Sequence, residues 1–178
     1  MLKVILAVAA ALFASLPASA LEPFGGSAAD HAEIQAFHDR ALEKFNAGDV
    51  SGAVDDYLAQ LRVLHTKSTG IRDRESLRTS WTKAFAPDAK TKPYLLSQVV
   101  DMGASGSAVG AWAYMVCNYA SVSLDKATNK AVGEYSNGRY IAVMTKTAEG
   151  WKVLLDIDNG AEGAGVDLEE KLKAEFGS

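Results

Sequence analysis

Two predicted apolar strands of this sequence carry histidine and aspartate side chains, the groups best suited to proton transfer. His65 ends the apolar run "LRVLH", and histidine side chains titrate near neutral pH. An imidazole facing an apolar cavity could therefore remove a proton next to a carbonyl group. Leu61, Val63 and His65 share one face of the predicted strand. We predict His65 as the candidate base, and the alternative of a hydrogen-bonded structural histidine stays open.

The stretch "LLDIDNG" carries two aspartates that could assist this base. Asp156 and Asp158 alternate onto one face of a predicted strand, and Trp151 lies on the other, better-buried face. A carboxylate facing the same cavity would orient the His65 ring and raise its basicity. The alternative role for Asp156 is an ion pair with Arg139 on a neighbouring strand. Asp158, near the strand end, is expected to be a solvated turn residue.

Other side chains could line a cavity. His38 shares a helical stripe with Ile34, Ala41 and Phe45, so we expect it to point toward the sheet and to help orient the base. The alternative, in which His38 only donates a hydrogen bond to a strand carbonyl, stays open. An inward-pointing Arg139 would bind a carboxylate on a ligand, whereas an outward-pointing one would be a charge at the rim. Aromatic residues suit either the core or a ligand cavity. The candidate catalytic residues are therefore His65, Asp156 and His38, and the candidate ligand-binding residues are Tyr57, Trp81, Tyr114 and Arg139.

We predict neither a metal nor a cofactor. His31 and His38 are two helical turns apart, which is awkward for coordinating one ion, and no cluster with metal-ligand spacing follows. Cys117 is the only cysteine, so an intrachain disulfide is excluded. Its strand-like surroundings predict a small buried apolar residue rather than a nucleophile.

The elements that must position these residues begin with helices. A helical pattern starts at Asp30, a predicted N-cap, and ends at Gly48, which suits the left-handed C-terminal conformation. Asp49 should cap a short second helix whose apolar face includes Tyr57. A third helix is predicted over residues 73–85, where apolar residues recur every fourth position before a proline.

The second half of the chain is rich in strands separated by turn signals. Helices followed by strands indicate an α+β fold, with about three N-terminal helices packed on one face of a curved antiparallel sheet. Such a sheet forms a cone with one open mouth, where a small ligand would bind. The tail, 161–178, is expected to carry a short, solvated helix. The predicted strands are "YLLSQVVDM", "SAVGAWAYMVCNYASV", "GEYSNGRYIAVMTK" and "WKVLLDID".

The N-terminal residues have the features of a secretory signal. Residues 1–20 combine Lys3, a short apolar stretch and an A-x-A site, so we expect cleavage after Ala20 and an exported, periplasmic or secreted protein. Residues 21–29 are expected to be a flexible leader and 30–160 one domain. No later stretch predicts stable membrane insertion. The net charge of −4, without a basic block, argues against nucleic acid as a partner.

The segments "FNAGDVSGAVDDY", "IRDRESLRTSW" and "GRYIAVMTKTAEGWKVLLDIDN" resemble the nuclear transport factor 2-like superfamily. Within it, the chain is most similar to the SnoaL-like proteins and their secreted relatives, over roughly 30–159. This resemblance implies a cone of three helices on a curved sheet that often dimerises through its outer face. The superfamily includes isomerases, hydrolases, cyclases, transport factors and assembly domains, so the fold alone does not give the function.

A more distant resemblance to ketosteroid isomerase implies specific positions. The catalytic aspartate of those enzymes falls on His65, and their helix-one tyrosine falls on Ala41, so steroid isomerisation is not expected. We predict an exported protein, a homodimer, that binds a small hydrophobic molecule. Two alternatives stay open: a cofactor-independent acid/base isomerase, cyclase or hydrolase with His65 as base, and a non-catalytic dimeric interaction scaffold.

Overall fold

The computed structural model describes residues 25–65, 70–161 and 163–177. The predicted signal peptide, 1–20, and the first part of the leader lie outside these residues. In chain order the elements are α1 (Ala28–Ala47), α2 (Val50–Asp55), β1 (Tyr57–His65), β2 (Ile71–Arg72), α3 (Arg74–Ala84), β3 (Thr91–Ala104), β4 (Trp112–Asp125), β5 (Ala131–Thr147), β6 (Gly150–Asp158) and α4 (Val166–Phe176).

Helix α1 begins earlier than its sequence pattern suggested. Its N-cap is Ser27, whose hydroxyl accepts from the Asp30 N–H at 3.2 Å, while the Asp30 carboxylate accepts from the Ser27 N–H at 2.9 Å. This reciprocal capping box makes Asp30 the third helical residue and not the cap. The end of α1 is as predicted, because Gly48 adopts a left-handed conformation with φ 76°. The helix therefore begins inside the predicted 21–29 leader.

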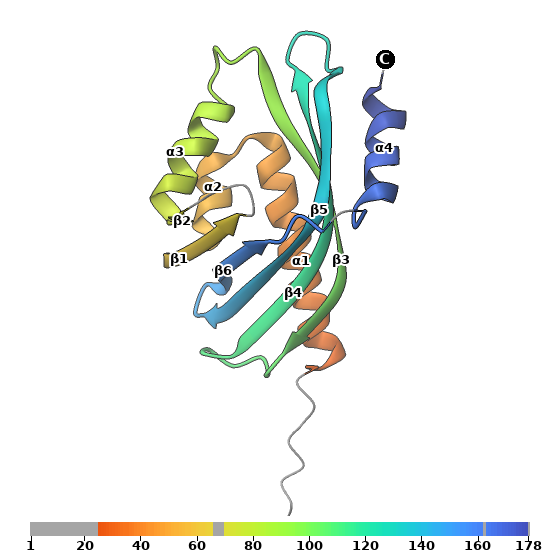
Figure 1. The fold of residues 1–178 in the computed structure, drawn as a ribbon. Coiled ribbons are helices and arrows are strands. Elements are labelled where there is room, and N and C mark those ends of the chain that lie inside the picture. Colours follow the sequence, from red (N-terminus) through yellow and green to blue (C-terminus); the bar gives the residue numbers. More distant parts are fainter. Residues whose placement is uncertain (1–24, 66–69, 162, 178) are drawn as a thin grey trace, which may run out of the picture.

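Six strands form one sheet in the order β2-β1-β6-β5-β4-β3. Strands β3 to β6 make an antiparallel meander, as predicted for the last three, and β1 lies parallel to β6 at the other side of the sheet. The sheet curves around α1 without closing (Figure 1). This confirms the predicted α+β cone. Tyr57 begins strand β1, so its prediction as part of the second helix was wrong.

The two faces of the sheet bury separate cores. On the concave face, Ile34 and Phe37 of α1 pack with Leu77 of α3 against apolar residues of β1, β4, β5 and β6. On the convex face, Leu168, Leu172 and Phe176 of α4 pack against β4. Figure 1 shows α4 across the sheet from α1. The prediction of a solvated tail helix was wrong, because this helix buries an apolar stripe.

None of the helices in residues 25–65, 70–161 and 163–177 has the length and apolar character needed to cross a lipid bilayer.

Candidate functional site

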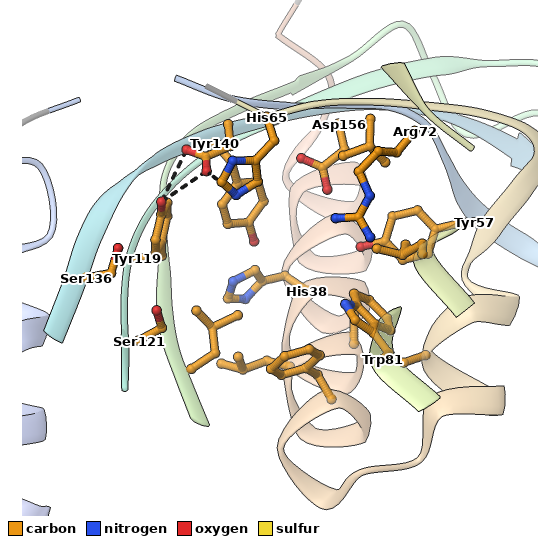
Figure 2. Close-up of a pocket in the computed structure, with 18 of the residues that line it drawn as sticks. His38, Tyr57, His65, Arg72, Trp81, Tyr119, Ser121, Ser136, Tyr140 and Asp156 are labelled. Atoms are coloured by element: carbon orange, nitrogen blue, oxygen red, sulfur yellow. Dashed lines mark hydrogen bonds and ion pairs between the residues drawn. The ribbon is translucent and has the colours of Figure 1, made fainter. Parts of the chain in front are cut away.

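A cavity of about 750 Å³ lies between the concave face of the sheet and the helices that it encloses. Helices α1 and α3 and strands β1, β4, β5 and β6 all contribute side chains, and Figure 2 shows many of these pointing toward one another. Much of the lining is aromatic or aliphatic, with polar groups interspersed. The lining includes His38, Ala41, Phe45, Tyr57, His65, Arg72, Trp81, Leu95, Tyr119, Ser121, Tyr135, Ser136, Asn137, Tyr140, Asp156 and Asp158.

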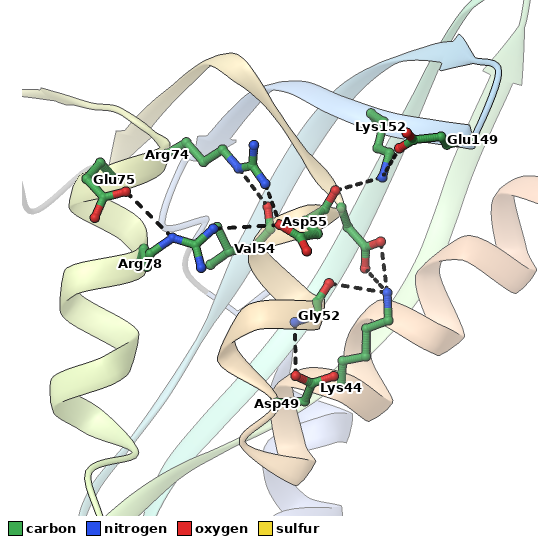
Figure 3. Close-up of polar contacts among 11 residues, drawn as sticks. Lys44, Asp49, Gly52, Val54, Asp55, Arg74, Glu75, Arg78, Glu149 and Lys152 are labelled. Atoms are coloured by element: carbon green, nitrogen blue, oxygen red, sulfur yellow. Dashed lines mark hydrogen bonds and ion pairs between the residues drawn. The ribbon is translucent and has the colours of Figure 1, made fainter.

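The α2 region fixes the aromatic wall of this cavity. Asp49 caps α2 by accepting from the Gly52 N–H at 2.9 Å, and Lys44 of α1 contacts Asp56 at 2.8 Å. Arg74 of α3 contacts Asp55 at 2.6 Å (Figure 3). Because these contacts tie α2 to both neighbouring helices, they hold the start of β1 against α3. The Tyr57 and Trp81 rings accordingly meet edge to face, 5.9 Å apart.

His65 and Asp158 form an ion pair on the concave face. The His65 Nε2 lies 3.0 Å from Asp158 Oδ2, and the side chains are 41% and 11% exposed. The Asp158 carboxylate also accepts from the Tyr119 hydroxyl at 3.2 Å and from the Gly160 N–H at 3.0 Å. Asp158 is therefore not the solvated turn residue that we predicted. It is the carboxylate that contacts the candidate base.

A β-bulge explains why the sequence-based prediction placed Trp151 on the face of β6 opposite to Asp156. The register between β5 and β6 shifts between Val143 and Met144, so that Met144 opposes Val153 whereas Val143 opposes Leu155. The additional residue on β6 resets the alternation of side chains. As a result Trp151 and Val153 share the concave face with Asp156 and do not lie opposite it. A strict period of two could not reveal this reset.

Asp156 lies in the cavity and has a raised pKa. Its carboxyl points into the cavity in Figure 2 and accepts no hydrogen bond from the described residues. Burial, and secondarily the negative charge of Asp158, raise the pKa of Asp156 from its usual 3.8 to about 7. This side chain can therefore both take up and release a proton near neutral pH.

Asp156 does not pair with Arg139, because the two residues lie on opposite faces. The Arg139 Nε donates to the Asn118 Oδ1 at 2.9 Å on the convex face. Tyr114, also on that face, donates to Asp101 at 3.3 Å. Neither Arg139 nor Tyr114 lines the cavity, so the expectation that they contact a ligand there fails on geometry. The guanidinium that does line the cavity belongs to Arg72.

His38 is buried, at 4% exposure, and reaches across to the sheet. Its Nε2 lies 3.0 Å from the Ser97 hydroxyl, which in turn lies 3.2 Å from the Tyr140 hydroxyl. The structure thus brings together His65, Asp156, His38, Tyr57 and Trp81, five of the seven predicted site residues. Their roles stay predictions.

Several lining residues escaped the sequence-based prediction. Tyr119 and Ser121 share the concave face of β4 with buried Cys117, and Tyr140 pairs with Asp158 on the adjacent strand. Only the register between strands relates these positions to His65 and Asp156. The prediction for Cys117 was sound, because it is fully buried and burial raises the pKa of its thiol to about 11.

Comparison with known proteins supports this architecture. The sequence matches the family model of the SnoaL-like domain over residues 26–155. No functionally curated protein sequence matches it significantly. An NTF-2 like protein of unknown function from Shewanella oneidensis MR-1 is 16% identical, with a TM-score of 0.57 over 72% of this chain and 98% of that chain. A domain of unknown function with a cystatin-like fold from Nostoc punctiforme is 19% identical, with a TM-score of 0.56 over 83% and 86%.

A third solved structure, a ketosteroid isomerase-like protein from Erwinia carotovora atroseptica, is 16% identical, with a TM-score of 0.53 over 71% of this chain and 92% of that chain. At such identities these likenesses show the fold alone. The fold and its open cavity are compatible with small-molecule binding or isomerase-type chemistry. On the match that spans most of the sequence, the chain belongs to the SnoaL-like domain family.

Proposed function

We propose that this protein binds a small, largely apolar molecule in the cavity of its cone and transfers a proton to or from it through Asp156. The observation that carries the proposal is one carboxyl group with a pKa of about 7, turned into a cavity of about 750 Å³. Ligand cavities of this size commonly combine an apolar lining with a few convergent polar groups. Trp81, Tyr57 and Phe45 supply the apolar contacts.

Asp156 offers carboxyl oxygens to a ligand in the cavity, whereas the Nε2 of His65, the base predicted from sequence, is already engaged. The His65 ring already contacts the Asp158 carboxylate at 3.0 Å, and its side chain is 41% exposed. The Asp156 carboxyl, by contrast, accepts no hydrogen bond from the described residues. A general base whose pKa lies near the working pH is both partly ionised and basic enough to accept a proton from carbon. The reaction best suited to this group is proton abstraction next to a carbonyl.

Binding is testable with Nile red, a neutral apolar dye whose fluorescence rises in apolar surroundings. Ala41 lines the cavity, so Ala41→Phe should fill part of it and lower the affinity for the dye. The matched control is Ala36→Phe, on the exposed face of the same helix, which should leave the affinity unchanged. Equal affinity in the wild type and both variants would refute binding in the cavity.

Proton transfer is testable with β-tetralone in heavy water. Wild-type protein should catalyse deuterium uptake next to the carbonyl, measured by mass spectrometry, and Asp156→Asn should lose this activity. His65→Ala, as a control that removes the other candidate base, should retain most of it. Exchange no faster than in buffer, or exchange lost only in His65→Ala, would contradict the assignment to Asp156.

We also propose that the protein acts after export, with the signal removed after Ala20, and that it forms a homodimer. The convex face beyond α4 carries half-buried apolar side chains, among them Val116, Ile141 and Val143, which a second copy would cover. Val143→Arg should then yield monomers in light scattering, whereas Thr79→Arg on α3 should not. Mass spectrometry of the protein isolated from its own cells should give the mass of a chain that begins at Leu21.

A further inference from the structure

A continuous chain of polar contacts crosses the wall of the cavity from the surface of α1. The Asp39 carboxylate, 63% exposed, lies 3.1 Å from the His38 Nδ1. The His38 Nε2 lies 3.0 Å from the Ser97 hydroxyl, and that hydroxyl lies 3.2 Å from the Tyr140 hydroxyl. Tyr140 lines the cavity. Three successive contacts therefore connect a solvated carboxylate to a group that a ligand can touch.

The chemistry of the groups fixes the direction of these hydrogen bonds. The bond from His38, followed by one from Gln35, lowers the pKa of Asp39, so this side chain is a carboxylate that only accepts. The His38 Nδ1 must therefore carry the donated proton. In a neutral imidazole the Nε2 then has a lone pair, accepts from Ser97, and leaves the Ser97 oxygen to accept from Tyr140. In this state the Tyr140 oxygen presents lone pairs to the cavity.

Protonation of His38 reverses the direction of the hydrogen bonds that run from His38 through Ser97 to Tyr140. The Nε2–H then donates to Ser97, the Ser97 hydroxyl donates to the Tyr140 oxygen, and the Tyr140 O–H is released to point into the cavity. Burial, and secondarily the neighbouring Cys117, hold the pKa of Tyr140 well above its usual range. The hydroxyl therefore keeps its proton in both states. Only its direction changes.

We propose that Tyr140 contacts an oxygen of the bound molecule and that His38, acting through Ser97, determines whether this hydroxyl donates or accepts. The inference rests on the proposed function, and it specifies the ligand as a molecule with a carbonyl oxygen on an apolar skeleton. Tyr140 is then the group that touches the ligand. His38 and Ser97 are positioning residues.

This arrangement complements proton abstraction by Asp156. As the Asp156 carboxylate takes a proton from carbon, the C–H electron pair forms a carbon–carbon double bond and the carbonyl π pair moves to oxygen. That oxygen takes the Tyr140 proton, Tyr140 takes the Ser97 proton, and Ser97 takes the proton of the His38 Nε2. One proton reaches Asp156 and one leaves His38, so the site's total charge is unchanged. Reversal of each step restores the starting state.

Other titratable groups lie near the contacts between His38, Ser97 and Tyr140, and any test must distinguish their effect on binding from that of His38. Asp39 contacts His38 from α1 itself, the Cys117 thiol of β4 contacts Tyr140, and Asp156 of β6 and His65 of β1 line the same cavity. A protonated Asp156 would also donate to a ketone. Binding should therefore be measured in an Asp156→Asn background, which removes that titration.

The experiment measures β-tetralone affinity against pH by calorimetry, together with the titration of the His38 ring by nitrogen NMR. With Asp156→Asn alone, the affinity should be about threefold to tenfold higher where NMR shows a doubly protonated His38 ring than where it shows a neutral one, which is the contribution of one hydrogen bond. Adding Tyr140→Phe or Ser97→Ala should abolish this dependence. The matched controls Tyr119→Phe and Ser121→Ala, in the same cavity but outside the chain, should retain it.

The possible outcomes test the hydrogen-bond relay, which is the set of contacts from His38 through Ser97 to Tyr140, separately from the proposed function. Ketone binding that is independent of pH, or equally dependent on pH without Tyr140, would overturn the relay and leave the cavity proposal intact. Failure of the ketone to bind at any pH would overturn both. In the neutral imidazole, NMR should find the proton on Nδ1. A proton on Nε2 would reverse the inferred direction and refute the relay without any ligand.

Discussion

The ionisation of Asp156 predicts how the stability of this protein depends on pH. Asp156→Asn replaces the carboxyl with a neutral amide of nearly the same shape, so it removes the titration while preserving the packing. The stability of the variant relative to the wild type should therefore depend on pH through this one group. All other ionisable groups are present in both proteins, so their contributions to this difference cancel to first order.

The size of the effect follows from the raised pKa. The Asp156 pKa is about 7 in the folded protein against 3.8 ordinarily. Between these values the folded state holds a proton that the unfolded state has released, so stability falls as pH rises, by about 1.4 kcal/mol per pH unit. The full difference corresponds to about 4 kcal/mol. Wild type and Asp156→Asn should thus be similarly stable at about pH 4, and the variant should be more stable by that amount above about pH 8.

Urea unfolding followed by circular dichroism, at a series of pH values, gives the free energy of unfolding of both proteins. The quantity that matters is their difference at each pH. A difference that stays constant from acid to weakly alkaline pH would refute the reasoning, because it would mean that the carboxyl is hydrated or paired when folded. Carbon NMR of the Asp156 carboxyl provides an independent titration if the variant unfolds too easily.

Three further perturbations test the packing and the electrostatics. Leu172→Ala should lower the free energy of unfolding by about 3 kcal/mol, because this fully buried side chain fixes α4 to the sheet, whereas exposed Lys171→Ala should change urea unfolding little. Gly48→Ala should cost about 1 kcal/mol or more in the same assay, since φ is +76° and a Cβ there would lie 3.0 Å from the Phe85 ring. Asp158→Asn should lower the Asp156 pKa in carbon NMR, because the Asp158 charge helps to raise it; an unchanged titration would show that the two carboxyls do not interact.

Local patterns in the sequence were enough to predict most helices and strands. Gly48 and Asp49 mark the end of α1 and the start of α2 through backbone preferences that act within a few residues. Asp73 likewise caps α3 by accepting from the Ser76 N–H. Such signals need no knowledge of distant residues. The cap of α1 was misplaced because Ser27 and Asp30 both suit that position, and only their reciprocal bonding distinguishes them.

The site was harder to predict because it depends on pairing between distant strands. His65 opposes Asp158 only because β1 lies parallel to β6, some ninety residues later in the chain. No local pattern specifies that pairing. The bulge that brings Trp151 onto the face of Asp156 is similarly invisible to a period-two analysis. The tail helix was misread for a related reason, since its apolar stripe acquires a partner only when the sheet has formed.

The two aspartates of "LLDIDNG" show how one strand produces different chemistry from identical side chains. Both face the concave side, two residues apart. Asp158 contacts His65 and accepts hydrogen bonds from Tyr119 and Gly160. Asp156 receives no such hydrogen bond from the described residues, and burial together with the charge of Asp158 favours its neutral form. A carboxyl whose surroundings raise its pKa toward neutrality is typical of acid/base sites. Asp158 therefore contributes to the proposed chemistry by holding the His65 ring, and Asp156 by remaining able to change its ionisation.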